Sequence, residues 1–164
     1  MDNIVLIGMP GSGKSTLGVV LAKMIGYGFI DSDLIIEEEE GRVLPDIIAQ
    51  EGIDGFNAIE NRVNCSIDCH RKIIATGGSA VYGEEAMKHL GEIGTIVYLK
   101  WSLKELATHL GDLEARGVVF RPGQDLKAIY EERCPLYEKY ADLIVDCEGD
   151  SVEGLVSRIM KAIS

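Results

Sequence analysis

A glycine-rich segment near the N-terminus has the residue types and spacing that bind phosphate. Residues 8–15 read GMPGSGKS and match the pattern G-x-x-x-x-G-K-[ST] in full. Because the glycines let successive backbone N–H groups point inward, such a loop surrounds phosphate oxygens, and the start of the next helix adds partial positive charge. Lys14 would then reach the β- and γ-phosphates, and the Ser15 hydroxyl would ligate Mg²⁺. The loop predicts a nucleotide site.

The residues expected to contact the nucleotide belong to this loop and the helix start after it: Gly11, Ser12, Gly13, Lys14, Ser15 and Thr16. A turn that only joins a strand to a helix would have no use for the Lys-Ser pair, which disfavours that alternative. The loop does not identify the reaction, because ATPases, GTPases and metabolite kinases share it. The chain has no guanine-reading N-K-x-D, and residues 73–78 read IIATGG where a mechanical ATPase would have a DExx strand end.

Two carboxylates follow the second expected strand, in the segment Asp31-Ser32-Asp33. Open α/β sheets bind their ligands at this end of the strands. One acid could hold the water shell of Mg²⁺, and the other could accept the proton of a hydroxyl group or orient that group. The alternative is helix capping by Ser32 or Asp33. Capping explains at most one of the two acids, so we favour a functional pair.

Composition limits the kinds of partner that the chain can bind. Its 164 residues have a formal net charge of −11 and a pI near 4.7, whereas nucleic-acid binders cluster Lys and Arg. No apolar run approaches the roughly 20 residues of a membrane span, and no secretory signal is apparent after Met1. We therefore expect a cytoplasmic monomer that binds small molecules, not nucleic acid or membrane.

Cys65, Cys69 and His70 could form a metal cluster, but reduced thiols in a core are favoured.

Aliphatic runs and helical patterns alternate along the chain. The expected strands are residues 3–7, 27–30, 72–75, 95–99 and 143–145. The expected helices are residues 14–25, 34–40, 44–51, 56–70, 83–90, 103–110, 126–140 and 152–163. This alternation predicts an α/β three-layer sandwich with a central parallel sheet of about five strands.

The whole chain, residues 1–164, is expected to be a single domain with one lid. Residues 111–124 contain glycines, charges and Pro122 but little apolar periodicity. A loop of this length inside a compact domain is usually functional. The sequence therefore predicts a lid at about residues 111–124.

Several motifs in fixed order give the chain a specific resemblance. They are the phosphate loop, Asp31-Ser32-Asp33, Phe56 with Glu60, ATGG at residues 75–78, Arg121-Pro122, and RCPLY at residues 133–137 with Ala141-Asp142. Together they resemble the motifs of shikimate kinases at similar spacing over nearly the whole chain. The resemblance implies a P-loop NTPase fold like that of the nucleoside monophosphate kinases. It also implies use of ATP and Mg²⁺, and conversion of shikimate to 3-phosphoshikimate in aromatic amino acid biosynthesis.

The resemblance also implies roles for individual residues. Asp31 would help to hold Mg²⁺, and Asp33 would bind the acceptor hydroxyl and act as base. Gly77 and Gly78 would present their backbone to the acceptor. The resemblance assigns roles to two arginines as well, and the planar guanidinium of this residue type suits phosphate and carboxylate oxygens. Arg121 would descend with the lid onto the phosphates, and Arg133 would bind the acceptor carboxylate. Lys14, Asp33 and Arg121 are thus the expected catalytic residues.

The chain departs from this family mainly at the acceptor end of the site. Shikimate kinases have F-R-x-x-E where residues 56–60 read FNAIE, so Asn57 replaces an arginine that shares the acceptor carboxylate with Arg133. Arg62 does not replace it, because five residues advance a helix by roughly 500° and turn Arg62 away from position 57. Ser79 stands where the family has a third glycine, and residues 121–124 read RPGQ where RPLL is usual. The expected acceptor-binding residues are Asp33, Asn57, Gly77, Gly78, Ser79 and Arg133.

Three functional hypotheses follow, from different classes. The first is an ATP-dependent kinase of a small hydroxy acid, with shikimate as the favoured acceptor. The second is a kinase of another polyol or hydroxy acid, such as a gluconate-type acceptor. The third is a nucleotide-binding regulatory module without transfer chemistry, which would not need the carboxylate pair together with Arg121 and Arg133.

Overall fold

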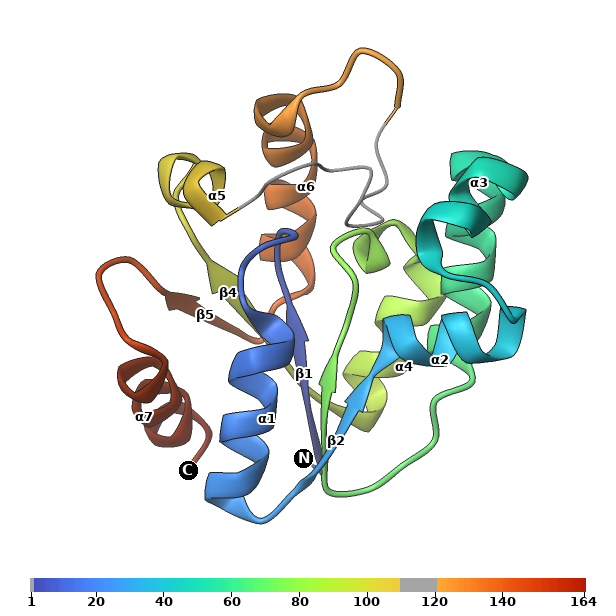
Figure 1. Cartoon of the computed structure of the whole chain (residues 1–164). Coiled ribbons are helices and arrows are strands. Elements are labelled where there is room, and N and C mark those ends of the chain that lie inside the picture. The colour runs from blue at the N-terminus through green and yellow to red at the C-terminus, as the bar shows by residue number, and fades with distance from the viewer. Residues whose placement is uncertain (1, 110–120) are drawn as a thin grey trace.

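A parallel five-stranded sheet forms the centre of the molecule (Figure 1). The computed structural model describes residues 2–109 and 121–164. The strands are β1 (Asn3–Ile7), β2 (Gly28–Asp31), β3 (Lys72–Ala75), β4 (Gly94–Lys100) and β5 (Leu143–Asp146), in the spatial order β2-β3-β1-β4-β5. All four neighbouring pairs are parallel. The predicted α/β fold with about five parallel strands is confirmed.

Helices cover both faces of this sheet. They are α1 (Lys14–Ile25), α2 (Ser32–Glu40), α3 (Leu44–Cys65), the 3-10 turn η1 (Ala80–Tyr82), α4 (Glu84–Ile93), α5 (Leu103–His109), α6 (Leu126–Tyr140) and α7 (Val152–Ile163). Helices α1 and α7 lie on one face, α4 and α6 lie on the other, and α2 and α3 extend past the β2 edge (Figure 1). Within the described ranges, no helix is both long and apolar enough to cross a lipid bilayer.

The central strand β1 shows why the sheet needs a helical layer on each side. All five of its residues are buried. Ile4 and Leu6 pack in the cluster that includes α1 and α7, whereas Val5 and Ile7 pack in the cluster that includes α4 and α6. Successive side chains of a strand point to opposite faces, so a strand whose last four residues are all aliphatic requires cover on both faces. This packing fixes the end of β1, from which the phosphate loop emerges.

Helix α3 differs from the two helices predicted at residues 44–51 and 56–70. It is assigned as one element with a break at Gly52, whose φ of 75° and ψ of 175° are not helical. The predicted gap between the helices is therefore real but shorter than expected. The predicted end at residue 70 is wrong, because α3 stops at Cys65. Ile67 instead turns into the core, and the Cys69 carbonyl accepts a hydrogen bond from Asn3 Nδ2 at 2.8 Å.

Most of the predicted lid, residues 111–120, lies outside the described residues. Its described end, residues 121–124, is a turn in which the Gln124 N–H donates to the Arg121 carbonyl at 3.0 Å. Gly123 has a φ of 86°, which favours glycine at this position. A single domain with a lid at residues 111–124 stays a prediction.

Candidate active site

The phosphate loop joins β1 to α1 in the conformation that an anion site requires. Gly13 adopts φ 80° and ψ 21° at the N-cap of α1, and Gly11 also has a positive φ of 79°. No side chain caps α1, and its first turn has no acidic residue. The first N–H groups of α1 therefore have no side-chain partner. Together with the helix dipole, they favour an anion at this position.

Lys14 folds back over the loop that precedes it. Its Nζ donates to the Gly8 and Met9 carbonyls, each at 2.9 Å, and to Ser12 Oγ at 3.2 Å. The side chain is buried, and burial lowers the pKa of Lys14 to about 8, although the carboxylates of Asp33 and Asp31 oppose the shift. A bound phosphate would add negative charge beside this amine. An anion in the loop therefore favours the charged form of Lys14.

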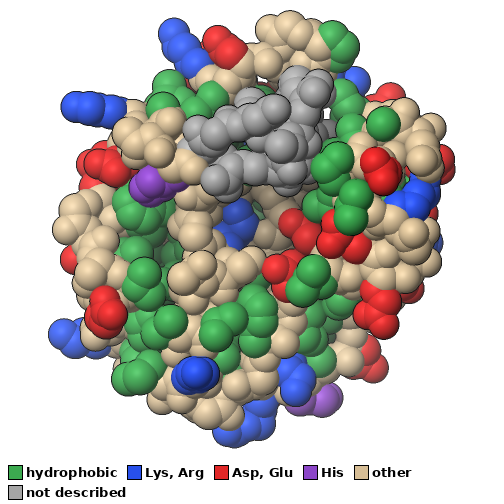
Figure 2. All heavy atoms as spheres, viewed as in Figure 1, with side chains coloured by type: hydrophobic (Ala, Val, Ile, Leu, Met, Phe, Trp, Pro, Cys, Tyr) green, Lys and Arg blue, Asp and Glu red, His purple; other side chains and the backbone are tan. Residues whose placement is uncertain are grey.

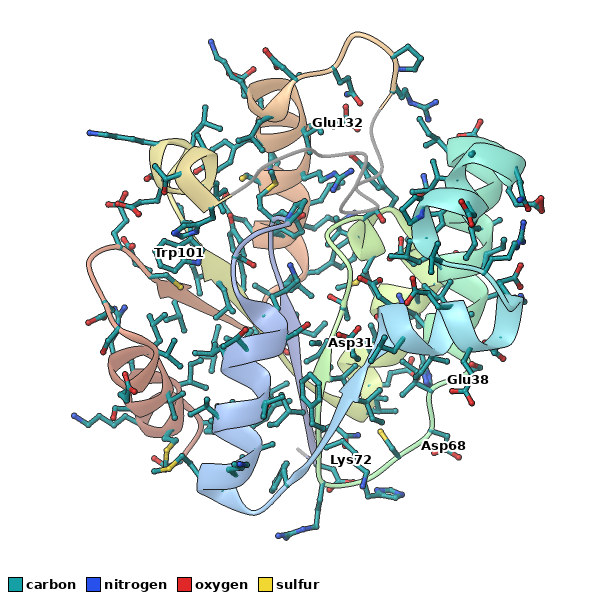
Figure 3. The ribbon with its side chains drawn as sticks, viewed as in Figure 1. Asp31, Glu38, Asp68, Lys72, Trp101 and Glu132 are labelled. Carbon is teal, nitrogen blue, oxygen red and sulfur yellow. The ribbon has the colours of Figure 1, made fainter. Side chains whose placement is uncertain are left out.

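Ser15 and Asp31 meet at the mouth of the loop and form a candidate metal site. Ser15 Oγ donates to Asp31 Oδ2 at 2.9 Å, and Figure 3 shows Asp31 at the end of β2. The other carboxylate oxygen of Asp31 accepts from the Asp33 N–H at 3.0 Å and caps α2. The alternative of capping by Ser32 or Asp33 is therefore wrong, since Asp31 is the cap. A hydroxyl and a carboxylate oxygen side by side are ligands that suit Mg²⁺.

Asp33 lies next to the phosphate loop and has the properties of a general base. Burial and, after it, the Asp31 charge raise the pKa of Asp33 to about 6, whereas Lys14 acts in the opposite sense. A Cβ on Gly77 would lie 2.7 Å from Asp33 Oδ1, so only glycine allows this approach. A carboxylate with a pKa just below neutral can accept a proton efficiently near pH 7.

One cavity of about 350 Å³ connects the phosphate loop to the predicted acceptor residues. It is lined by Pro10, Gly11, Gly13, Lys14, Ser15, Thr16, Asp33, Leu44, Phe56, Thr76, Gly77, Gly78, Ser79, His109 and Arg133. Figure 2 shows a hollow in this face of the molecule, with cationic side-chain atoms inside it and acidic groups along one side. Both ends of the predicted site therefore open into the same space.

Glu60 and Ser79 form a buried pair that sequence reasoning missed. Ser79 Oγ donates to Glu60 Oε1 at 2.6 Å, and both residues are almost fully buried. Glu60 Oε2 has no hydrogen-bond partner among the described residues, and a Cβ on Gly77 would lie 2.9 Å from it. Burial raises the pKa of Glu60 to about 8, with a further contribution from the Asp33 charge. Position 60 belongs to the quoted motif, but nothing in the sequence indicates its partner.

Arg133, which the resemblance assigns to the acceptor carboxylate, is buried and lines the larger cavity. It is 2% exposed, and its Nη1 would lie 3.2 Å from a Cβ on Gly78. Its Nε donates to the Tyr82 hydroxyl at 3.2 Å, and its guanidinium carbon lies 5.3 Å from the centre of the Tyr82 ring. Sequence reasoning missed Tyr82, because no pattern marks it.

A second, smaller cavity of about 40 Å³ also borders Arg133. It is lined by Ile53, Asn57, Tyr82, Arg121, Gln124, Glu132 and Arg133. Asn57 therefore lies beside Arg133, as the motif predicted, and its Oδ1 is buried with no hydrogen-bond partner in the described part of the chain.

Arg121 and Arg62 both lie away from the phosphate loop. Arg121 is exposed and pairs with Asp54 at 3.1 Å, so the structure does not bring it into the larger cavity. Arg62 pairs with Glu40 at 3.2 Å, which confirms that it does not replace the missing arginine at position 57. Among the described residues, no three or more His, Cys, Asp or Glu side chains form a group that could hold a metal ion. The metal cluster considered for Cys65, Cys69 and His70 is therefore absent from this part of the structure.

A phosphoryl donor and an acceptor must share one space for direct transfer, and the larger cavity offers such a space at the carboxyl ends of the strands. The fold and the site therefore define a P-loop phosphotransferase. A family model described as "Shikimate kinase" matches residues 10–164. A shikimate kinase of Thermodesulfovibrio yellowstonii is 36% identical, with 98% of this chain and 94% of that protein covered. A shikimate kinase of Persephonella marina is 32% identical, with 99% of each chain covered.

A solved structure of a shikimate kinase is also similar to this chain. Shikimate kinase from Acinetobacter baumannii in complex with shikimate has a TM-score of 0.84 and 27% identity, with 99% of this chain and 93% of that chain covered. The chain belongs to the shikimate kinase family and is a phosphotransferase with an alcohol acceptor. This confirms the family resemblance.

Proposed function

We propose that this protein transfers the γ-phosphate of ATP to a hydroxyl of shikimate and forms 3-phosphoshikimate and ADP. Use of ATP follows from its membership of a kinase family. The observation that supports the acceptor most directly is the shared cavity, which Asp33 and Arg133 line together with residues of a complete phosphate loop. Shikimate offers both groups that these two residues suit, a hydroxyl for Asp33 and a carboxylate for Arg133.

The transfer step can be written from these residues. The acceptor oxygen forms a bond to the γ-phosphorus, the bond from that phosphorus to the β,γ-bridging oxygen breaks, and the hydroxyl proton passes to the Asp33 carboxylate. Lys14 and the loop N–H groups stabilise the charge on the phosphate oxygens. Ser15 and Asp31 would hold Mg²⁺, which when bound neutralises charge on the β- and γ-phosphates.

The remaining residues position the two substrates. Gly77 and Gly78 present their backbone to the acceptor, because a side chain at either position would meet Asp33 or Pro10 at less than 3 Å. Arg133 binds the acceptor carboxylate. Arg121 is proposed to reach the phosphates, for which it must leave Asp54.

Family membership favours this function over the two alternatives. A gluconate-type acceptor would also use Asp33 and Arg133, but the family match and full-length relatives point to shikimate. A regulatory module would not need a base with a pKa near 6 beside the phosphate loop.

The test is ADP release with a panel of acceptors that includes shikimate and gluconate, and mass spectrometry of the product. We expect ADP release that depends on shikimate and a product heavier by one phosphoryl group. Asp33→Asn should lose this activity but still bind ATP. Release with gluconate alone, or release that no acceptor stimulates, would contradict the proposal.

A further inference from the structure

A hydrogen-bonded chain connects the acceptor-binding Arg133 to the turn that contains Arg121. Its first link is Tyr82, whose hydroxyl accepts from Arg133 Nε at 3.2 Å and donates to Glu132 Oε1 at 2.5 Å. Burial raises the pKa of Tyr82, and its bond to Glu132 does so too. The hydroxyl therefore stays protonated, and its single proton can serve only Glu132.

The second link runs from Glu132 to Gln124. Glu132 Oε2 accepts from Gln124 Nε2 at 3.0 Å, and Gln124 Oε1 accepts from the Arg121 backbone N–H at 2.7 Å. These partners fix the orientation of the amide, because a backbone N–H can only donate and a carboxylate can only accept. Figure 3 shows Glu132 on α6, below the turn that contains residues 121–124.

Each link uses a side-chain group that an apolar residue would lack. Leucine, the usual residue of the family at position 124, could bond to neither Glu132 nor the Arg121 N–H. Phenylalanine at position 82 would keep the ring beneath Arg133 but would lose both hydrogen bonds of the hydroxyl. The same residues line the small cavity that Asn57 also borders, next to the buried Arg133. This series of hydrogen bonds therefore ends at Arg133, where an acceptor carboxylate would bind.

We propose that Tyr82, Glu132 and Gln124 are positioning residues that hold Arg133 toward the acceptor and couple it to the Arg121 turn. The proposal rests on the function proposed above, because it assigns Arg133 to the acceptor carboxylate. Tyr82 fixes the rotation of the guanidinium by accepting from its Nε. Since Asn57 is neutral at the position where the family has an arginine, the precise orientation of Arg133 matters more for acceptor binding here.

Two single variants and their combination test the coupling. Tyr82→Phe and Gln124→Leu should each raise the KM for shikimate roughly fivefold to tenfold, as expected for the loss of one or two hydrogen bonds. The KM for ATP and the melting temperature should change little, because neither residue lines the phosphate loop. The double variant should be little worse than the poorer single variant, because both substitutions interrupt one chain.

Matched controls make the same chemical changes elsewhere. One control is Tyr27→Phe, because Tyr27 directly precedes β2 and lies at the end of the sheet away from the cavity. The other is Gln50→Leu, because Gln50 lies on the exposed side of α3. Both controls should leave the KM for shikimate unchanged. Calorimetric titration of shikimate into each variant separates acceptor binding from turnover.

The outcomes separate this inference from the proposed function. Shikimate turnover by the wild type with unchanged KM in both variants would overturn the network but leave the function intact. Additive effects of the two substitutions would also overturn the coupling. A wild type without shikimate turnover would overturn the proposed function, and with it the assignment of Arg133 on which the network rests. A raised, non-additive KM for shikimate alone would support the proposal.

Discussion

Glu60 should make the stability of the protein depend on pH, and Glu60→Gln tests this. The residue is 2% exposed, and the pKa of its carboxyl group is raised from 4.5 to about 8, mainly by burial and then by the Asp33 charge. The folded state therefore binds a proton that the unfolded state releases between these two values. The contribution of Glu60 to the free energy of unfolding is therefore fully present below pH 4.5, and it is lost as the pH rises toward 8.

The magnitude follows from the size of the shift. Each pKa unit corresponds to about 1.4 kcal/mol, so the buried anion would cost the folded state on the order of 3 to 5 kcal/mol above pH 8. Glutamine keeps the shape and the acceptor for Ser79 but cannot ionise. Glu60→Gln should therefore match the wild type near pH 5 and be more stable by about that amount at pH 9.

Urea unfolding at pH 5, 7 and 9 measures this difference directly. Titrating groups that do not interact with Glu60 are common to both proteins, so their effects cancel in the comparison, whereas Asp33 and Lys14 interact with it and contribute to the measured difference. Glu131→Gln makes the same change on the exposed surface of α6 and should show no such trend, because its side chain is 66% exposed. A constant difference between Glu60→Gln and the wild type across the pH range would refute the reasoning, as would a loss of stability at pH 9.

Three further predictions concern nucleotide, acceptor and lid. Lys14→Ala should abolish transfer to every acceptor, because it removes the charge at the β- and γ-phosphates, and near-normal turnover would contradict the kinase assignment. Asn57→Arg should lower the KM for shikimate roughly tenfold to a hundredfold by restoring a charge-assisted bond of about 1.5 to 3 kcal/mol. Tight wild-type binding that this variant does not change would show that another group holds the carboxylate. Hydrogen exchange should show residues 111–124 protected when nucleotide and acceptor bind, and equal exchange in both states would argue against a lid.

Local sequence patterns were enough to predict the position of the phosphate loop between a strand and a helix and much of the fold. The bounds of β1, α1 and β3 agree with the structure, because aliphatic runs and flanking glycines determine them locally. The phosphate loop is equally local, since all its groups come from one continuous segment. The end of α3 was not predicted in this way: the residues after it contact a distant segment, and the Cys69 carbonyl accepts a hydrogen bond from Asn3, 66 residues away.

The acceptor half depends on contacts between distant segments, and the sequence indicated them less well. Glu60 and Ser79 lie on α3 and on the loop after β3, and only the fold brings them together. Tyr82 and Gln124 meet Glu132 from two other elements. Comparison with the family motif identified Ser79 and Gln124 as departures, but it could not say which side chains they contact.

Two departures from the family motif, Asn57 and Ser79, are related through the charge of Glu60. An arginine at position 57 would lie three residues before Glu60 on one helix face, where it could stabilise the carboxylate as an anion. With Asn57 in its place, burial favours the protonated acid. Ser79 then supplies a hydrogen bond that glycine cannot, and this bond fixes one oxygen of the acid while Oε2 still faces Gly77 and Asp33. The neutral side chain at position 57 and the hydroxyl at position 79 therefore both bear on one buried carboxyl group. Since that group lies next to the proposed base, its protonation state also affects the environment of Asp33.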